Sequence, residues 1–217
     1  MATAFYDVDE TILKFNSMMS FFDFFTKEFD LNYLREEFYL LFSKMKKSKK
    51  SREELNEAYY SFFKGFKLEE LEQAGNSWFN ASIYDKDVFF KNVVDTILNH
   101  QRKNEKIVFV SGSMHPLLDP IADLLNVDAV LCTSLCIDDN GVITGKIEKP
   151  QIIGQGKREA MQGYAKRNNI NLQECYSYGD DISDIPMLEC VGSPVCVGNQ
   201  VLLTQYAMEH SWKVLPL

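Results

Sequence analysis

The sequence predicts an α/β protein in which a doubly wound parallel sheet carries an all-helical insertion. Three observations lead to this fold class. An apolar strand opens the chain at residues 3–7, residues 12–85 carry only helical hydrophobic spacing, and helices alternate with strands from residue 87 onward. Alternation at this spacing is typical of a parallel sheet. Because ligands bind beyond the carboxyl ends of such strands, the residues at those ends are the first candidates for a functional site.

The segment that follows the first strand is predicted to be helical throughout. Residues 12–29 are crowded with Phe and Met at a spacing that wraps most of a helix. A second helix is expected over residues 31–45, followed by a basic connector at 44–52 and by helices at 53–64 and 68–76. No strand pattern interrupts them, so we expect a separate inserted domain.

The remainder of the chain alternates between the two kinds of element. Helices are expected over residues 88–100, 116–125, 156–168, 185–190 and 201–209. Strands are expected over residues 107–110, 129–137, 142–147, 175–178, 194–197 and 213–215, with a hairpin turn at 138–141. Asp7, Ser111 and Asp180 each end a predicted strand. They should therefore meet at one edge of the sheet.

Composition excludes several classes of protein. The 217 residues are 46% hydrophobic and 13% aromatic, which is ample for a buried core. A net charge of −8 argues against nucleic acid as the main partner. No apolar stretch approaches the roughly 20 residues of a membrane span, and the first apolar run ends at Asp7, which leaves no room for a secretion signal. We expect a cytoplasmic protein with no membrane partner; its oligomeric state is left open.

Metal sites built on cysteine or histidine are not predicted. The five cysteines form no C-x-x-C pair, and the three histidines show no zinc spacing. In a chain of this size, reduced thiols are expected rather than disulfides.

Two carboxylates follow the first predicted strand at a spacing of two residues. Residues two apart in a strand share a face, so Asp7 and Asp9 should point into the same crevice. Unit charges about 4 Å apart near a protein surface repel by roughly 4 kcal/mol. The pair therefore needs a shared proton or a cation. A lone D-x-D is equally consistent with an acidic turn, so its interpretation depends on the other strand ends.

Three further polar segments stand where a phosphate site would need them. Each also has a simpler reading: Ser111-Gly112 as a turn, Gly156-Lys157 as the start of a surface helix, and Asp180-Asp181 as solvated loop charge. A P-loop is excluded because G-x-x-x-x-G-K-[ST] is absent, and the absence of G-x-S-x-G leaves an acyl hydrolase unsupported. Ser111 and Asp180 stand at predicted strand ends, as Asp7 does, and this agreement favours one phosphate site.

In chain order, these segments resemble the four motifs of the haloacid dehalogenase superfamily. The matching residues are Asp7-Val8-Asp9-Glu10-Thr11, Ser111-Gly112-Ser113, Gly156-Lys157-Arg158 and Gly179-Asp180-Asp181-Ile182-Ser183-Asp184. The chain is similar in particular to the phosphoserine-phosphatase-like branch, in which a helical cap follows the first motif. The resemblance implies a Rossmann-like core at residues 1–14 and 86–217 and a helical cap domain at 15–85.

The resemblance also implies an activity. The expected reaction is Mg²⁺-dependent hydrolysis of a phosphomonoester, on a small phosphorylated metabolite, through an aspartyl-phosphate. A phosphotransferase that uses the same intermediate with an alcohol or sugar acceptor stays open. Two departures argue against phosphoserine as the substrate: Asn16 stands where the branch has a glutamate, and Ser113-Met114 stands where it has Gly-Phe.

Roles for individual residues follow from the same resemblance. Asp7 is the expected nucleophile, and Asp9 the expected general acid and base. The expected Mg²⁺ ligands are Asp7, Asp180 and the backbone carbonyl of Asp9, with Asp184 and Ser183 holding waters around the ion. Ser111, Gly112 and Lys157 are expected to bind the phosphoryl group. Candidate substrate contacts are Asn16, Ser17 and His115, whereas Asp181 is expected to face solvent.

Overall fold

The computed structural model describes residues 2–217, and its main sheet is parallel throughout. The strands stand in the order β3-β2-β1-β6-β7-β8. Their bounds are Thr3–Tyr6 (β1), Lys106–Ser111 (β2), Ala129–Cys132 (β3), Tyr176–Gly179 (β6), Ser193–Val197 (β7) and Lys213–Leu215 (β8). From β1 the chain winds outward through β2 to β3, and then returns to β6 on the other side of β1. The predicted doubly wound, Rossmann-like sheet is confirmed, and its switch point lies between β1 and β6.

Helices cover both faces of this sheet because neighbouring strand residues point to opposite sides. Ala4 and Tyr6 belong to the hydrophobic core under helices α5 and α6, whereas Phe5 belongs to the core on the opposite face. The bounds are Lys91–Arg102 (α5), His115–Leu124 (α6), Gln155–Arg167 (α7), Ile185–Leu188 (α8) and Val201–Glu209 (α9), with short 3-10 helices at Leu172–Glu174 and Ile182–Asp184.

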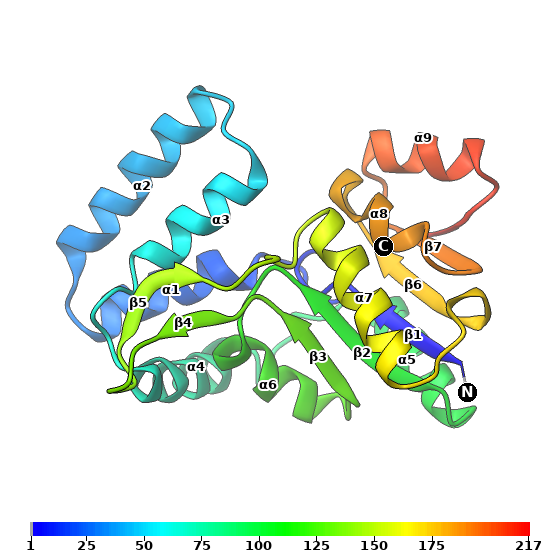
Figure 1. Cartoon of the computed structure of the whole chain (residues 1–217), viewed down its shortest axis with the longest axis horizontal. Helices are drawn as coiled ribbons and strands as arrows, with labels where there is room; N and C mark the ends of the chain where they lie inside the picture. The colour runs from blue at the N-terminus through cyan, green and yellow to red at the C-terminus, as the bar shows by residue number, and fades with distance from the viewer. Residues whose placement is uncertain (1) are drawn as a thin grey trace.

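The residues between β1 and α5 form the helical insertion. It consists of helices α1 (Ser17–Glu28), α2 (Asn32–Lys47), α3 (Arg52–Ser61) and α4 (Leu68–Ser82). Figure 1 shows α2 and α3 standing away from the sheet. Aromatic rings fill the space between the helices, with ring centroids 4.1 Å apart for Phe22 and Phe38 and 5.9 Å apart for Phe22 and Phe63. The prediction of a helical insertion is confirmed over the described residues.

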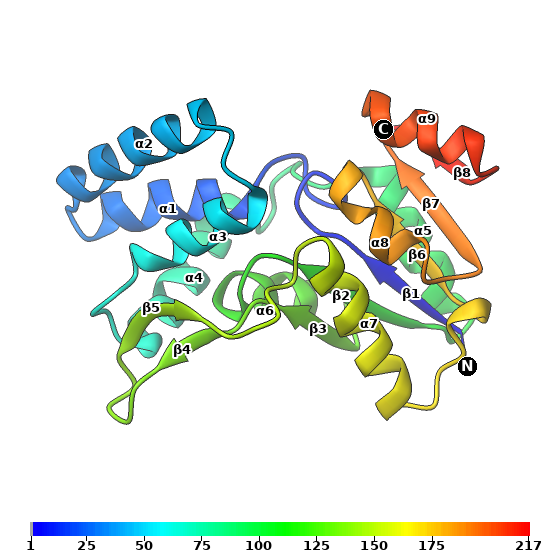
Figure 2. The same ribbon diagram turned by 45° about the horizontal axis from the view of Figure 1, so that its top comes forward.

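The end of the insertion that carries α4 is fixed to the rest of the protein. Helix α4 packs closely on α6, since a Cβ atom on Gly75 would lie 2.1 Å from the carbonyl oxygen of Pro116. A two-stranded hairpin, β4 (Leu135–Ile137) with β5 (Ile143–Ile147), also bonds to the insertion. Gly65 N–H donates to the Ile143 carbonyl at 2.9 Å. Figure 2 shows this hairpin beside α3 and α4.

Two predicted elements were wrong in extent. The helix predicted over residues 12–29 begins only at Ser17, because the Asn16 side chain accepts a hydrogen bond from Met19 N–H at 3.0 Å and caps it. The strand predicted over residues 129–137 is two strands. Thr133 N–H bonds to the Ser113 carbonyl, and the chain then leaves the main sheet to form β4.

Other boundaries shifted by a few residues. Helix α2 continues through Lys47 and α3 begins at Arg52, so part of the predicted basic connector is helical. Helix α4 runs on to Ser82, and α5 starts at Lys91 rather than at residue 88. Over residues 2–217, no helix combines the length and the apolar character that a bilayer crossing requires.

Candidate active site

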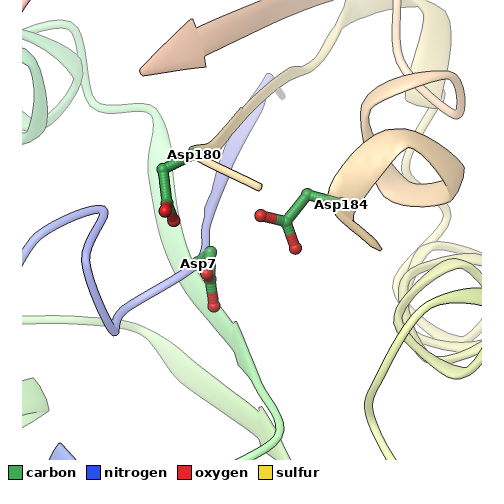
Figure 3. Close-up of side chains that lie close together, drawn as sticks. All are labelled: Asp7, Asp180 and Asp184. Atoms are coloured by element: carbon green, nitrogen blue, oxygen red, sulfur yellow. The ribbon is translucent and has the colours of Figure 1, made fainter. Parts of the chain in front are cut away.

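Three carboxylates converge at the switch point of the sheet. Asp7 follows β1 and Asp180 follows β6, which are parallel neighbours, and Asp7 N–H donates to the Tyr178 carbonyl at 2.9 Å. Oxygen atoms of Asp7, Asp180 and Asp184 all lie within 4.8 Å of one another. Figure 3 shows the three side chains gathered in one space. The prediction that the ends of β1 and β6 bring acidic groups together is confirmed.

Gly179 makes the close approach of Asp184 possible. A Cβ atom on Gly179 would lie 2.7 Å from the Cβ of Asp184, which is too close for any side chain. Asp184 is held by the turn that follows, because its Oδ2 accepts from Asp181 N–H at 3.2 Å. The glycine of the Gly-Asp motif is therefore required by packing against the third carboxylate.

Lys157 is buried among the carboxylates. Its Nζ lies 2.7 Å from an oxygen of Asp7 and 2.7 Å from an oxygen of Asp184. Burial pushes the pKa of the ammonium down, but the carboxylates of Asp184 and Asp7 outweigh it and raise that pKa above its ordinary value. Lys157 therefore stays charged.

One lysine does not balance three acids. Burial, together with Asp184 and Asp180, raises the pKa of Asp7, although Lys157 opposes the shift. Burial also raises the pKa of Asp180 to about 6, against a hydrogen bond from Thr11 Oγ1 at 2.6 Å. These hard oxygen donors, with excess negative charge, fit a cation such as Mg²⁺. Asp7 and Asp180 were predicted to hold the ion directly and Asp184 only through water, whereas the carboxylates of all three lie close enough together to hold one ion.

We expect Mg²⁺ to raise the melting temperature more at about pH 8 than at about pH 5. Because the fold raises the pKa of Asp180 from 3.8 to about 6, it favours the protonated acid. The stability gained from this group is present below about pH 4 and is lost as the pH rises through about 6. A bound cation offsets the loss only where the carboxylates are ionised. Thermal unfolding with and without Mg²⁺ at both pH values measures this; equal increments would contradict it. In Asp180→Asn, the increment should be small at both.

Asp9 stands beside this cluster with a different environment. Burial raises the pKa of Asp9 to about 6, although hydrogen bonds from Ser17 lower it. Ser17 N–H donates to Asp9 Oδ1 at 2.8 Å, and the Ser17 side chain is fully buried. Ser17 was predicted to contact substrate, but the structure places it behind Asp9, where it orients the carboxylate. A carboxyl group with a pKa near neutral can both give and take a proton.

A cavity of about 240 Å³ opens over these groups. The core contributes Asp7, Asp9, Glu10, Ser111, Gly112, Ser113, Ile153, Lys157, Asp180, Asp181 and Ser183 to its lining, and the helical insertion with its entrance contributes Asn16, Met18, Met19, Phe42, Lys46, Arg52, Leu55, Asn56 and Tyr59. Asn16, a candidate substrate contact, lines the cavity. His115 does not: its Nδ1 lies 2.8 Å from Asp119 Oδ1 on the exposed side of α6, and it borders another hollow.

Arg52 is a site residue that sequence reasoning missed. From the start of α3 its guanidinium donates to Asp181 Oδ1 at 2.6 Å and to Ser183 Oγ. The prediction that Asp181 faces solvent was therefore wrong, and its side chain is only 27% exposed. The pair ties the helical insertion to the loop that carries Asp180. Arg52 is visible in the sequence only as the last residue of a basic run.

Two stacked tyrosines support the acidic cluster from behind. Tyr6 and Tyr178 precede Asp7 and Asp180 on neighbouring strands, and their parallel rings lie 4.3 Å apart. The Tyr178 hydroxyl lies 2.8 Å from Nε2 of buried His100. The spacing of the strand ends therefore depends on the packing of these rings, which no sequence motif predicts.

Sequence comparisons with known proteins match most of the chain. A family model described as haloacid dehalogenase-like hydrolase matches residues 4–189. A Streptomyces azureus protein named for inhibition of morphological differentiation is 32% identical over 128 residues, which are 59% of this chain and 46% of the relative. Phosphoserine phosphatase SerB1 of Mycobacterium tuberculosis is 25% identical over 221 residues, which cover 98% of this chain and 70% of the relative. The chain spans about half the length of the curated relatives it matches at higher identity.

Solved structures share the fold. A crystal structure of a protein of unknown function from Bordetella pertussis Tohama I matches with a TM-score of 0.88 at 21% identity, over 99% of this chain and 97% of the other. A substrate-bound phosphoserine phosphatase matches with a TM-score of 0.70 at 19% identity, over 100% of this chain and 93% of the other.

Proposed function

The chain belongs to the haloacid dehalogenase-like hydrolases, and from this premise we propose that it is a Mg²⁺-dependent phosphomonoester hydrolase. Its substrate is a small phosphorylated metabolite, and its intermediate an aspartyl-phosphate on Asp7. One observation carries the proposal, the carboxylate cluster at Asp7. Lys157 pairs with both Asp7 and Asp184, and the Asp180 carboxylate lies beside them. Asp7 also lines a small cavity together with Ser111 and Gly112.

Asp7 is the proposed nucleophile. One of its oxygens lies against Lys157, so the other is left to attack phosphorus. The new bond from this oxygen to phosphorus replaces the bond to the leaving alcohol, which departs with a proton from Asp9. Water then displaces the phosphoryl group from Asp7, and Asp9 takes the proton that the water loses. When bound, Mg²⁺ supplies positive charge that keeps Asp7 ionised and offsets charge on the phosphoryl oxygens.

The phosphoryl group is held by neutral and cationic donors. Ser111 ends β2 and Gly112 follows it on the cavity wall, where the hydroxyl and an N–H can donate to phosphoryl oxygens. Lys157 adds a fixed charge from the start of α7. Such preorganised charge is the main source of catalysis in phosphoryl transfer. We also propose that residues 15–85 act as the cap over the leaving group, on a core made of residues 1–14 and 86–217.

Phosphate release from a panel of phosphorylated metabolites tests the function. With Mg²⁺ present, the protein is expected to hydrolyse at least one small monoester faster than a preparation of Asp7→Asn does. Activity equal in the two preparations would contradict the proposal. Adding alcohols or sugars and analysing the products distinguishes a hydrolase from a phosphotransferase, because a transferase forms a new phosphate ester.

Asp9→Asn should slow the reaction most for esters with poor leaving groups. Removing the acid leaves an alkoxide without a proton, whereas p-nitrophenolate leaves unaided. We expect a loss of about 10²–10⁴-fold for an alkyl phosphate and a clearly smaller loss for p-nitrophenyl phosphate. Steady-state kcat on both esters measures this. Equal losses on the two would mean that Asp9 is not the acid.

A further inference from the structure

Part of the cavity wall that the helical insertion forms is apolar. The helical insertion contributes Met18 and Met19 from α1, Phe42 from α2 and Leu55 from α3. Met18 and Phe42 are almost completely buried. These side chains can cover methylene or ring carbons, but they offer no hydrogen bonds. A leaving group rich in hydroxyls would leave its polar groups unpaired against them.

The charged groups on this wall are all positive. Among the lining residues, the insertion contributes Lys46 and Arg52 and no acid. Asn16, at the entrance of α1, is uncharged. The acidic lining residues, namely Asp7, Asp9, Glu10, Asp180 and Asp181, all come from the core. The wall therefore offers no carboxylate that would pair with an ammonium group on the leaving alcohol.

Most polar groups on this wall already have partners. Arg52 is bonded to Asp181 and Ser183 of the core. The Asn56 amide donates to Gln151 Oε1 at 3.1 Å, and the Tyr59 hydroxyl donates to the Met18 carbonyl. Lys46 differs: over residues 2–217 its ammonium takes part in no ion pair. Lys46 is thus the charge available to a ligand.

We propose that Lys46 and the apolar wall select phosphomonoesters whose leaving group is a short apolar chain that ends in an anion. The inference rests on the proposed function and names its substrate class. The phosphate lies at the carboxylate cluster, the carbon chain lies against Met19, Phe42 and Leu55, and the terminal anion meets Lys46. A volume of about 240 Å³ limits the chain to a small metabolite, since sites for drug-sized ligands are larger.

Three matched esters test this substrate class. Butyl phosphate, 4-(phosphonooxy)butanoate and 3-aminopropyl phosphate share a chain of three methylenes and differ at the far end, which is a methyl, a carboxylate or an ammonium group. We expect kcat/KM to be highest for the carboxylate, about fivefold lower for the methyl and lower still for the ammonium. One exposed ion pair accounts for about this factor. The preference should weaken as salt is added, because salt screens exposed charges.

Variants of neighbouring lysines locate the preference. Lys46→Met keeps a long side chain without charge, and should lower the carboxylate-to-methyl ratio of kcat/KM about fivefold. Lys47→Met is the matched control, since Lys47 lies next along α2 but does not line the cavity. It should leave the ratio as it is. Lys46→Glu should reverse the order, so that the ammonium ester is preferred to the carboxylate ester.

The outcomes separate this inference from the function on which it rests. If no phosphate is released from any of the three esters or from a wider panel, the proposed function is contradicted. Phosphate released from all three at similar rates, or fastest from the ammonium ester, would overturn the substrate class and leave the hydrolase in place. A carboxylate preference that survives in Lys46→Met would overturn the role of Lys46.

Discussion

Asp7→Asn is expected to lower kcat for phosphate release by about 10⁴-fold or more, a loss typical of removing a nucleophile. The amide has nearly the shape of the carboxylate but cannot form the acyl phosphate. The same change should not lower stability, because Asp7 is one of three carboxylates crowded around a single lysine. Phosphate release and thermal unfolding on one preparation measure both effects.

The control for this variant is Asp119→Asn. Asp119 pairs with His115 on the exposed side of α6, outside the cavity lining, so this isosteric change should leave kcat within about twofold. If Asp7→Asn kept a tenth of the activity, or if both variants lost the same amount, Asp7 would not be the nucleophile.

Removal of Mg²⁺ by EDTA should abolish turnover, and added Mg²⁺ should restore it. The fold raises the pKa values of Asp7 and Asp180. Without the cation, the cluster therefore resists full ionisation. An un-ionised Asp7 is a poor nucleophile. Full activity in excess EDTA would overturn the metal assignment.

The variant Asp180→Asn tests whether Asp180 is a ligand of the cation. Mutating a residue that only supports a metal ligand lowers metal affinity by about 10–100-fold. Losing a direct ligand should lower it by at least as much. The Mg²⁺ concentration for half-maximal rate should rise by about that factor or more. Asp181→Asn is the matched control, because Asp181 bonds to Arg52 and is not part of the three-carboxylate cluster.

The sequence predicted most of the fold because each strand is short, apolar and followed by a turn or a helix. The convergence of Asp7 and Asp180 followed from one rule, that parallel strands end at the same edge. The family resemblance read from the four motifs is confirmed by the family match. Residues next to strands are predictable in this way because backbone geometry fixes where they lie.

Residues whose position depends on packing were not predictable. Arg52 reaches Asp181 only because α4 and the β4–β5 hairpin hold the insertion against the core. His115 follows the second motif closely, yet the start of α6 directs it to Asp119. Ser17 stands between the cavity residues Asn16 and Met18 in the sequence. Because Ser17 is the first residue of α1, however, its N–H bonds to Asp9. Helix phase and the contacts between the insertion and the core decide such positions, and a local sequence pattern predicts neither.

Trapping the intermediate tests the central claim most directly. Rapid quenching of the reaction with borohydride reduces an acyl phosphate on aspartate to homoserine, which peptide mass spectrometry can locate. We predict homoserine at position 7 when a phosphorylated substrate and Mg²⁺ are present, and none without substrate or in Asp7→Asn. Reduction at another carboxylate, or phosphate release with no trapped residue during turnover, would contradict the account.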